Sequence, residues 1–407
     1  MFLDSGDKAE CFGCEGCAQS CSRGAIFMEE DGEGFRYPQI DLLKCTTCGI
    51  CREVCPFEHA PEKHIEDRYV FGGWHCSPET RFESTSGGAF SAIVDAFCDE
   101  NYAIFGAEAR ALQVFHSYVT DKSRIGKFRK SKYSQSMIGL TYRKAREFLN
   151  NGCKVLFSGT PCQIAGLLSF LKEAHTDTEK LLTVEVVCEG VPSPLYIRKL
   201  DKEMKRKYGV GICSLDYRYT GKSVLFHGKW DFEKMKIVLE DKKKILKKDR
   251  WLNPFWSIWL EHLMSRPSCY ECSFATQERI ADISLADLWG VHLYCPDLYG
   301  QNKGSSLIIA NTEKGREVVG KAQHFMYGHE LRFEDAVKYQ GPLRKNIDCN
   351  PNREIFMRDL ESNMTYKEIN KKWTKKVPFK LLWQKYVWGN RQRIVFWKLT
   401  KGRYKIK

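Results

Sequence analysis

The sequence contains no apolar run of the length that membrane insertion or export requires. Although 43% of its 407 residues are hydrophobic, no uninterrupted apolar stretch reaches the ~18 residues of a bilayer-spanning helix. The opening segment, MFLDSGDKAECFGC, also lacks the apolar centre of a signal peptide. We therefore expect a globular, cytoplasmic protein of roughly two to three domains.

Acidic residues are missing from one part of the chain, residues 369–407. This segment holds thirteen Lys or Arg residues, a number equal to the net charge of +13, so the rest of the chain is balanced. Its interleaved aromatic residues are Trp373, Phe379, Trp383, Trp388, Phe396 and Trp397. Such a segment either contacts an anionic membrane surface or an acidic protein partner, or caps the neighbouring domain. No other feature is typical of base recognition, so we expect no nucleic-acid partner.

The eighteen cysteines do not indicate a disulfide framework, because no export signal accompanies them and many have metal-ligand spacing. Eight of them form an internal repeat in which identical 2-2-3 spacings recur after 34 residues. The two copies are Cys11, Cys14, Cys17 and Cys21, and Cys45, Cys48, Cys51 and Cys55. This is the bacterial ferredoxin pattern, in which the fourth cysteine of each motif binds the other motif's cluster.

The repeat therefore predicts two 4Fe-4S clusters. Their ligand sets are Cys11, Cys14, Cys17 and Cys55 for one cluster, and Cys45, Cys48, Cys51 and Cys21 for the other. Pro56 follows the second motif as expected, whereas Ser22 follows the first. The alternative is zinc, which generally takes paired ligands from two separated knuckles.

From about residue 85 the pattern changes to alternating helices and strands. We expect helices over 86–100, 136–152 and 160–174, and strands over 101–109, 113–120, 154–159 and 181–190. This alternation indicates an α/β domain with a largely parallel sheet. Antiparallel strands are expected over 212–240, a charged turn or solvated face over 242–250, and further strands over 283–290 and 305–315.

These patterns divide the chain into consecutive parts. Residues 1–60 form a ferredoxin-like module with two 4Fe-4S clusters, and residues 70–152 and 153–325 form the two parts of a mixed, largely parallel α/β flavin-binding domain. Residues 326–407 form a basic, aromatic-rich, helical C-terminal extension.

Two predicted helix starts could hold the phosphates of a flavin. The stretch 84–90, STSGGAF, includes Ser86, Gly87 and Gly88, where glycines would allow a ligand close to the backbone. The stretch 157–163, FSGTPCQ, includes Ser158, Gly159, Thr160 and Gln163, with Thr160 as N-cap. Both could equally be ordinary helix caps. The chain has neither a G-x-G-x-x-G turn nor a Walker A motif, so a nucleotide would be held in another way.

Several stretches together resemble the beta subunit of coenzyme F420-reducing hydrogenase and its relatives, which include formate dehydrogenase beta subunits. They are STSGGAFSAI, SKYSQSMIG, VLFSGTPCQIAGL, VVCEGVPSP, RPSCYEC and ISLADLWG, in this order between about residues 80 and 325. The resemblance implies FAD, a 4Fe-4S cluster near it, and hydride exchange with a substrate that it does not identify.

The resemblance also implies the ligands of a third cluster, Cys162, Cys188, Cys269 and Cys272. Cys162 lies in the first turn of a predicted helix, where the helix dipole favours a thiolate. Cys188 follows a predicted parallel strand, at the edge where open α/β sheets place their sites. A zinc site and four unrelated thiols are the alternatives. The remaining cysteines show no such arrangement; they are Cys76, Cys98, Cys153, Cys213, Cys295 and Cys349.

Residues for proton chemistry are less clearly marked. Asp287 matches an acidic position of the family motif, or is an ordinary loop carboxylate, and Ala286 stands where glycine is more usual. Glu189 stands where relatives often have histidine, which weakens any shared proton-donor role. Lys132 either pairs with a cofactor phosphate or is a solvated lysine.

The sequence thus predicts an iron-sulfur flavoprotein oxidoreductase. Electrons would pass between a reduced ferredoxin or another redox protein and a small-molecule hydride acceptor or donor, through the clusters and FAD. The alternative is an electron-transfer subunit that serves a partner enzyme without catalysing a reaction itself.

Overall fold

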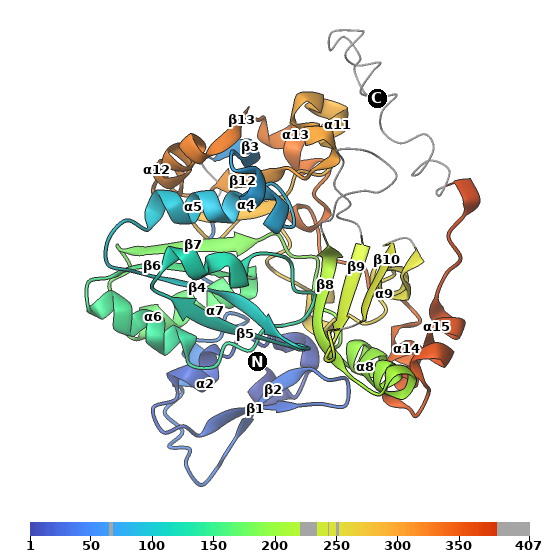
Figure 1. Ribbon diagram of the computed structural model, residues 1–407. Coiled ribbons are helices and arrows are strands. Elements are labelled where there is room, and N and C mark those ends of the chain that lie inside the picture. Colours follow the sequence, from blue (N-terminus) through green and yellow to red (C-terminus); the bar gives the residue numbers. More distant parts are fainter. Residues whose placement is uncertain (65–67, 220–233, 243, 250–251, 381–407) are drawn as a thin grey trace.

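The computed structural model describes residues 1–64, 68–219, 234–242, 244–249 and 252–380 (Figure 1). Its main feature is an eight-stranded mixed sheet in the order β13-β3-β12-β11-β7-β6-β4-β5. The strands are β3 (Tyr69–His75), β4 (Tyr102–Arg110), β5 (Gln113–Val119), β6 (Lys154–Gly159), β7 (Leu181–Val186), β11 (Ile283–Asp287), β12 (Ser306–Ala310) and β13 (Met326–Glu330).

Only the centre of this sheet is parallel. Strands β11, β7, β6 and β4 run parallel to one another, whereas β5, β12, β3 and β13 pair antiparallel with their neighbours. The expectation of a largely parallel sheet was therefore wrong for the edges. The difference comes from the short β4–β5 hairpin and from the antiparallel pairings of β12 with β11 and of β3 with β12 and β13.

Helices cover both faces of the sheet, and alternate strand residues point to each face. Leu156 packs with α5 (Ala89–Phe97) and α12 (Glu313–Ala322), whereas Val155 and Phe157 pack with α6 (Thr141–Asn150) and α7 (Pro161–Glu173). Burial on both faces explains the continuous apolar run KVLF in this strand.

The N-terminal module lies beneath this α/β domain in Figure 1 and packs against α6 and α7. It contains a hairpin and short helices. They are α1 (Phe2–Ser5), η1 (Lys8–Glu10), α2 (Gly16–Ser20), β1 (Ile26–Glu30), β2 (Arg36–Ile40) and α3 (Ile50–Glu53).

A second, three-stranded antiparallel sheet lies beside the large one (Figure 1). It contains β8 (Ile212–Tyr219), β9 (Lys234–Leu239) and β10 (Ile245–Asp249), and it packs with α8 (Leu195–Tyr208), α9 (Pro254–Trp259), α14 (Arg353–Glu361) and α15 (Tyr366–Trp373). The antiparallel prediction for 212–240 holds for its described residues. In the charged segment 242–250, residues 242, 244, 245, 247 and 248 are exposed, as expected for a solvated face. Residues Ile245–Asp249 form the edge strand β10, where lysines discourage pairing with other chains.

The remaining elements are short. They are α4 (Pro78–Glu83), η2 (Lys122–Phe128), α10 (Pro267–Tyr270), α11 (Val291–Tyr294), η4 (Pro296–Asn302), η5 (Gln323–Phe325), α13 (Phe333–Val337) and η6 (Gly341–Leu343). None of the helices in the described ranges has the length and apolar character needed to cross a bilayer.

Two sequence-based boundaries shift. The helix expected from residue 136 begins at Thr141, because Met137 instead forms a bridge beside β5 with Phe115. The large sheet continues past residue 325, since β13 pairs with β3. In the C-terminal extension, Trp373 packs on Phe356 with ring centroids 5.3 Å apart and thus caps the small sheet's core. The predicted tail aromatics Trp383, Trp388, Phe396 and Trp397 lie outside the described residues.

Candidate functional site: a chain of thiol clusters beside a cavity

The two cysteine motifs of the N-terminal module have the same backbone geometry. In each motif, the residue two positions after the first cysteine has a positive φ: Gly13 in the first and Thr47 in the second. Its N–H donates to the sulfur of that first cysteine, with 3.4 Å from N to Sγ in both motifs. A second positive φ recurs at the N-caps of α2 and α3. The repeat is therefore structural, and backbone donors face the sulfurs.

Four of the eight cysteines meet at one small cavity. Cys11, Cys14, Cys17 and Cys55 all line it, which is the set predicted for one cluster from the alternating motif rule. Burial and the neighbouring thiols raise the pKa of Cys14 and of Cys17 well above the ordinary value. Iron binding must therefore displace protons from these thiols. The ligand set of the second cluster stays a prediction. Within this set, burial raises the pKa of Cys51, and the nearby thiols of Cys45 and Cys48 raise it further.

The four thiols implied for a third cluster converge at a different cavity. Cys162 lies in the first turn of α7, Cys188 in the loop after β7, and Cys269 and Cys272 around α10. All four line the same cavity. Burial raises the pKa of Cys162 to about 11 and of Cys269 to about 12, and neighbouring thiols of this set contribute. Burial and the other three thiols also raise the pKa of Cys188.

Local geometry leaves little room around these sulfurs. The Gly190 N–H lies 3.4 Å from Cys188 Sγ, in the same arrangement that Gly13 and Thr47 make in the N-terminal module. Gly190 has φ +93°, and a Cβ there would lie 3.2 Å from Cys269 Cβ. A larger residue would therefore displace Cys269, so the VCEG loop and the RPSCYEC loop fit each other only through this glycine.

The first N-terminal set lies directly against the helix that carries Cys162. A Cβ on Gly166, one turn after Cys162 on α7, would lie 2.9 Å from Cys14 Cβ and 3.0 Å from its sulfur. The Tyr142 hydroxyl lies 3.0 Å from the Cys14 carbonyl oxygen and 2.7 Å from that of Gln163. The N-terminal module therefore packs with Cys14 against the helix that carries Cys162, one turn away from that thiol.

Arg266 connects the same two clusters. Its fully buried guanidinium donates to the Cys11 carbonyl at 2.8 Å, to Gln135 Oε1 at 3.0 Å and to the Arg36 carbonyl at 3.0 Å. It also lies over the Tyr37 ring, 4.2 Å from the centroid. Its charge opposes the rise in the pKa of Cys162 and of Cys269 that burial causes. The sequence analysis missed this residue, although it directly precedes the RPSCYEC cysteines.

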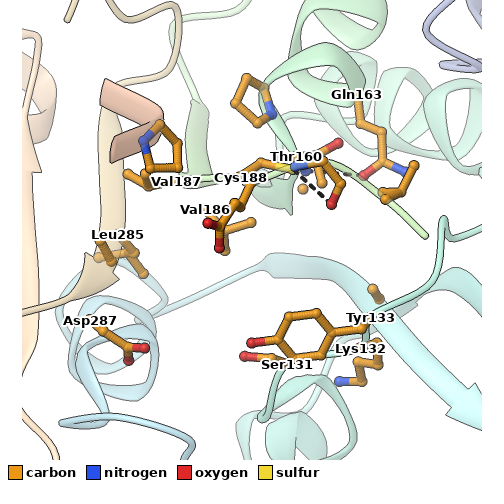
Figure 2. A pocket seen from close by; sticks show the side chains of 18 of the residues that line it. Ser131, Lys132, Tyr133, Thr160, Gln163, Val186, Val187, Cys188, Leu285 and Asp287 are labelled. Carbon is orange, nitrogen blue, oxygen red and sulfur yellow. Dashed lines mark hydrogen bonds between the residues drawn. The ribbon is translucent and has the colours of Figure 1, made fainter. Parts of the chain in front are cut away.

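The cavity beside the third thiol set has a volume of about 660 Å³, within the range of roughly 300–1,000 Å³ typical of cofactor and ligand pockets. It lies beyond the carboxyl ends of β6, β7 and β11, where open α/β sheets place their ligands. In Figure 2, Thr160 and Cys188 lie together on one wall, Ser131, Lys132 and Tyr133 on a second, and Asp287 on a third.

Seven of the eight residues predicted for cofactor binding line this cavity: Ser86, Gly88, Lys132, Ser158, Gly159, Thr160 and Gln163. Gly87 does not. Its N–H donates to Ser306 Oγ at 3.0 Å, and a Cβ there would lie 2.4 Å from the Gly73 carbonyl oxygen. The close approach that requires a glycine here is thus made by the sheet, and a role of Gly87 in cofactor binding stays a prediction.

Two of the lining residues already have protein partners for their polar atoms. Gln163 accepts from the Thr160 N–H at 3.0 Å and donates to Ser136 Oγ at 2.9 Å, so it holds two cavity loops together. Lys132 donates to three carbonyls at the end of η2 at 2.8 to 3.1 Å, and burial lowers its pKa to about 7. Lys132 is therefore not the solvated lysine that the sequence left open.

Asp287 ends β11 and forms an ion pair with the buried Arg218, whose guanidinium also lies 5.7 Å from the centroid of the Trp289 ring. The Asp287 carbonyl accepts from Gln340 Nε2 at 2.6 Å. The sequence did not indicate Arg218, because it lies on the small sheet, 69 residues away from its partner. Asp287 is thus a positioned carboxylate in the cavity wall.

Comparisons with known proteins agree with this arrangement. Residues 10–59 match the 4Fe-4S dicluster domain, and residues 152–330 match the family described as the C terminus of the coenzyme F420 hydrogenase/dehydrogenase beta subunit. The chain thus carries, one after the other, a segment similar to 4Fe-4S dicluster domains and a segment similar to beta subunits of coenzyme F420 hydrogenase/dehydrogenase.

Individual relatives cover different amounts of the chain. The coenzyme F420-dependent sulfite reductase of Methanocaldococcus jannaschii is 28% identical over 323 residues, which are 77% of this chain and 46% of that protein. The dihydromethanopterin reductase (acceptor) of Methanosarcina mazei is 45% identical over 53 residues, 12% of this chain and 20% of that protein. This chain thus spans about half or less of the length of these relatives.

Among solved structures, a chain of the F420-reducing [NiFe] hydrogenase complex from Methanosarcina barkeri matches with a TM-score of 0.43 and 15% identity. The match covers 76% of this chain and 91% of that chain.

Proposed function

We propose that this chain is an iron-sulfur flavoprotein oxidoreductase that exchanges electrons with a reduced ferredoxin-like protein and hydride with a small molecule. Two 4Fe-4S clusters would be held by the N-terminal module, a third by Cys162, Cys188, Cys269 and Cys272, and FAD by the adjoining cavity. The observation that carries the proposal is the convergence of those four thiols on the wall of one large cavity, one helix turn from Cys14.

The cavity residues fit a flavin dinucleotide. The starts of α5 and α7 line the cavity, and the positive end of each helix dipole there favours phosphate. Arg129, Lys130 and Arg218 supply positive charge, and Tyr133, Trp256 and Trp289 supply aromatic surface; all six line the cavity. When bound, FAD would convert between single electrons and hydride.

The chain's own residues would then bind, orient and exclude water. Gln163 and Ser136 fix the loop that faces the start of α7, and His116 accepts a hydrogen bond from Ser136 behind it. Asp287, held by Arg218, supplies a carboxylate on the wall opposite that loop and is our candidate for contact with the substrate.

Cofactor analysis of anaerobically purified protein tests this proposal. We expect about twelve iron atoms and one FAD per chain, since each of three clusters holds four irons. Eight irons without flavin would contradict the enzyme and favour an electron-transfer subunit. Colourless protein with stoichiometric zinc would overturn both.

The Cys269→Ser variant tests the third cluster by itself. We expect it to lose about four iron atoms and to retain the N-terminal eight, because Cys11, Cys14, Cys17 and Cys55 form a separate cavity. The matched control is Cys349→Ser, which changes an exposed cysteine and should keep all the iron. Full iron retention in Cys269→Ser would contradict the ligand assignment.

A further inference from the structure

Cys295, Asp297 and His329 lie together at the β13 edge of the large sheet, and none of the three lines the cavity. Cys295 follows α11, Asp297 lies in η4, and His329 lies on the edge strand β13. One ligand atom from each of the three side chains lies within 4.8 Å of the other two, which is a spacing that could hold a metal ion. The sequence analysis found no arrangement for Cys295, and the fold corrects this.

The ligand atoms converge on one point. Cys295 Sγ lies 3.1 Å from Asp297 Oδ1 and 3.4 Å from His329 Nε2, and Asp297 Oδ2 lies 2.8 Å from the same Nε2. In a nucleophilic triad the carboxylate would contact the imidazole nitrogen opposite the one facing the thiol. Here both groups face Nε2, which is the arrangement of metal ligands and not of a triad.

The other imidazole nitrogen already has a partner. His329 Nδ1 lies 2.9 Å from the Glu330 carbonyl oxygen, which can only accept, so Nδ1 carries the proton. In the neutral ring the Nε2 lone pair therefore points at a carboxylate oxygen 2.8 Å away. Two acceptors at this distance require a proton or a metal cation between them. Metal-binding histidines are usually oriented in this way, by a hydrogen bond from the nitrogen that does not bind the metal to a backbone carbonyl.

We propose that Cys295, Asp297 and His329 bind one divalent ion of the zinc class. One thiolate, one imidazole and one carboxylate form a mixed donor set that suits zinc, with the fourth tetrahedral position left to water or another ligand. Cys295 is buried, whereas the side chains of Asp297 and His329 are 49% and 47% exposed, so the open position faces solvent.

The site would connect two parts of the fold that the chain joins only distantly. Residues 295 and 297 continue from the segment that contains Asp287 and Trp289, whereas His329 belongs to the last strand of the sheet. A bound ion would thus hold the segment that follows Asp287 and Trp289 against the edge strand β13. The site is independent of the proposed flavin chemistry, because none of its three residues lines the cavity.

Zinc binding by the anaerobic, iron-loaded full chain tests the proposal. After equilibration with micromolar Zn²⁺ and gel filtration, we expect about one zinc per chain with unchanged iron. Cys295→Ser and His329→Gln should each weaken zinc binding at least tenfold, by analogy with the roughly 10- to 100-fold losses seen even for outer-shell changes. The matched controls are Cys76→Ser and His324→Gln, which alter exposed residues and should retain the zinc.

X-ray absorption at the zinc edge separates this site from zinc in a vacant cluster site. We expect one sulfur at about 2.3 Å and nitrogen or oxygen ligands at about 2.0–2.2 Å. Four sulfur ligands would overturn the proposal, as would zinc binding that is unaffected by Cys295→Ser and His329→Gln. If the parent chain binds no more zinc than the variants do, the proposal is wrong and the three residues form only an ion pair beside a thiol. Iron content equal to that of the parent identifies variants that have folded.

Discussion

His116 is held neutral behind the cavity by its surroundings. Its Nε2 lies 2.9 Å from the Ser158 carbonyl oxygen, which can only accept, so Nε2 carries the proton and Nδ1 accepts from Ser136 Oγ at 2.9 Å. The ring also stacks on Phe157, with centroids 5.4 Å apart. Burial lowers the pKa of His116 to about 4. A single residue thereby makes the loop that carries Ser136 sensitive to acid.

This shift predicts how stability depends on pH. The unfolded chain binds a proton at His116 below its ordinary value of 6.5, whereas the folded chain resists protonation until about 4. Stability from this group is therefore complete above pH 6.5 and is lost as the pH falls toward 4. Between pH 7.5 and 5.5 we expect a loss of about 1.4 kcal/mol in the free energy of unfolding, measured by anaerobic urea denaturation.

Variants isolate the contribution of His116 from those of other groups. His116→Gln should reduce the decline between pH 7.5 and 5.5 by about 1.4 kcal/mol, whereas His324→Gln, at an exposed position, should leave it unchanged. An equal pH dependence in the parent and in His116→Gln would show that the ring is not held neutral.

At the scale of elements, α7 positions thiols of both domains. Thr160 and Gln163 form a capping box that fixes its start, Cys162 lies in its first turn, and Gly166 contacts Cys14 of the other module one turn later. Because residues four apart lie on the same helix face, Cys162 and Gly166 present one surface to the N-terminal module. The contact depends on the absence of a side chain at Gly166.

Gly166→Ala should therefore separate the modules. The added Cβ would lie 2.9 to 3.0 Å from Cys14 Cβ, Cys14 Sγ and Tyr142 Oη, and overpacking of this kind costs about 1–3 kcal/mol. We expect that loss in anaerobic urea denaturation, together with faster release of iron. Gly320→Ala is the matched control, because this helical glycine on α12 has open space around it and should gain up to about 1 kcal/mol. Equal stability of the two variants would contradict close contact at α7.

The sequence predicted those elements whose signals are local. The start of α7 follows from Thr160, Pro161 and Gln163, and the grouping of Cys55 with Cys11 follows from the spacing rule, because both signals lie within a few residues. Met137 was assigned to a helix from its local sequence pattern. Its bridge to Phe115 depends on a partner 22 residues away, which that pattern does not show. Long-range pairing decides such positions, and a local pattern does not record it.

The same limit explains the site residues that were missed. Arg218 and Asp287 meet across two sheets, and Cys295 and His329 are 34 residues apart on different elements, so neither pair leaves a recognisable spacing. Gly87 shows a related limit. Its requirement for a small residue was visible, but the neighbour that imposes it, the Gly73 carbonyl, becomes known only from the fold.

At the scale of the whole molecule, the thiol clusters lead from the surface to the cavity. Cys48 of the second N-terminal motif is exposed, Cys14 of the first set is buried against α7, and Cys162 lies at the cavity. Beside the exposed end, Leu42 and Leu43 are 81% and 99% exposed. Adjacent large apolar side chains with such exposure next to a cluster motif are typical of a docking surface for a protein partner.

We therefore expect Leu42 and Leu43 to contact the protein electron donor. The measurement is the concentration of reduced ferredoxin-type donor that gives half-maximal bleaching of the iron-sulfur absorption. Replacing both leucines with serine should raise this concentration at least tenfold, because each leucine buried in the complex contributes about 1.5–3 kcal/mol to binding. Reduction by dithionite, which needs no docking surface, should be unchanged, as should stability, since both side chains are exposed. Ile355→Ser, which changes an exposed residue of α14, is the matched control and should behave like the parent. An unchanged donor dependence in the double variant would place electron entry elsewhere on the molecule.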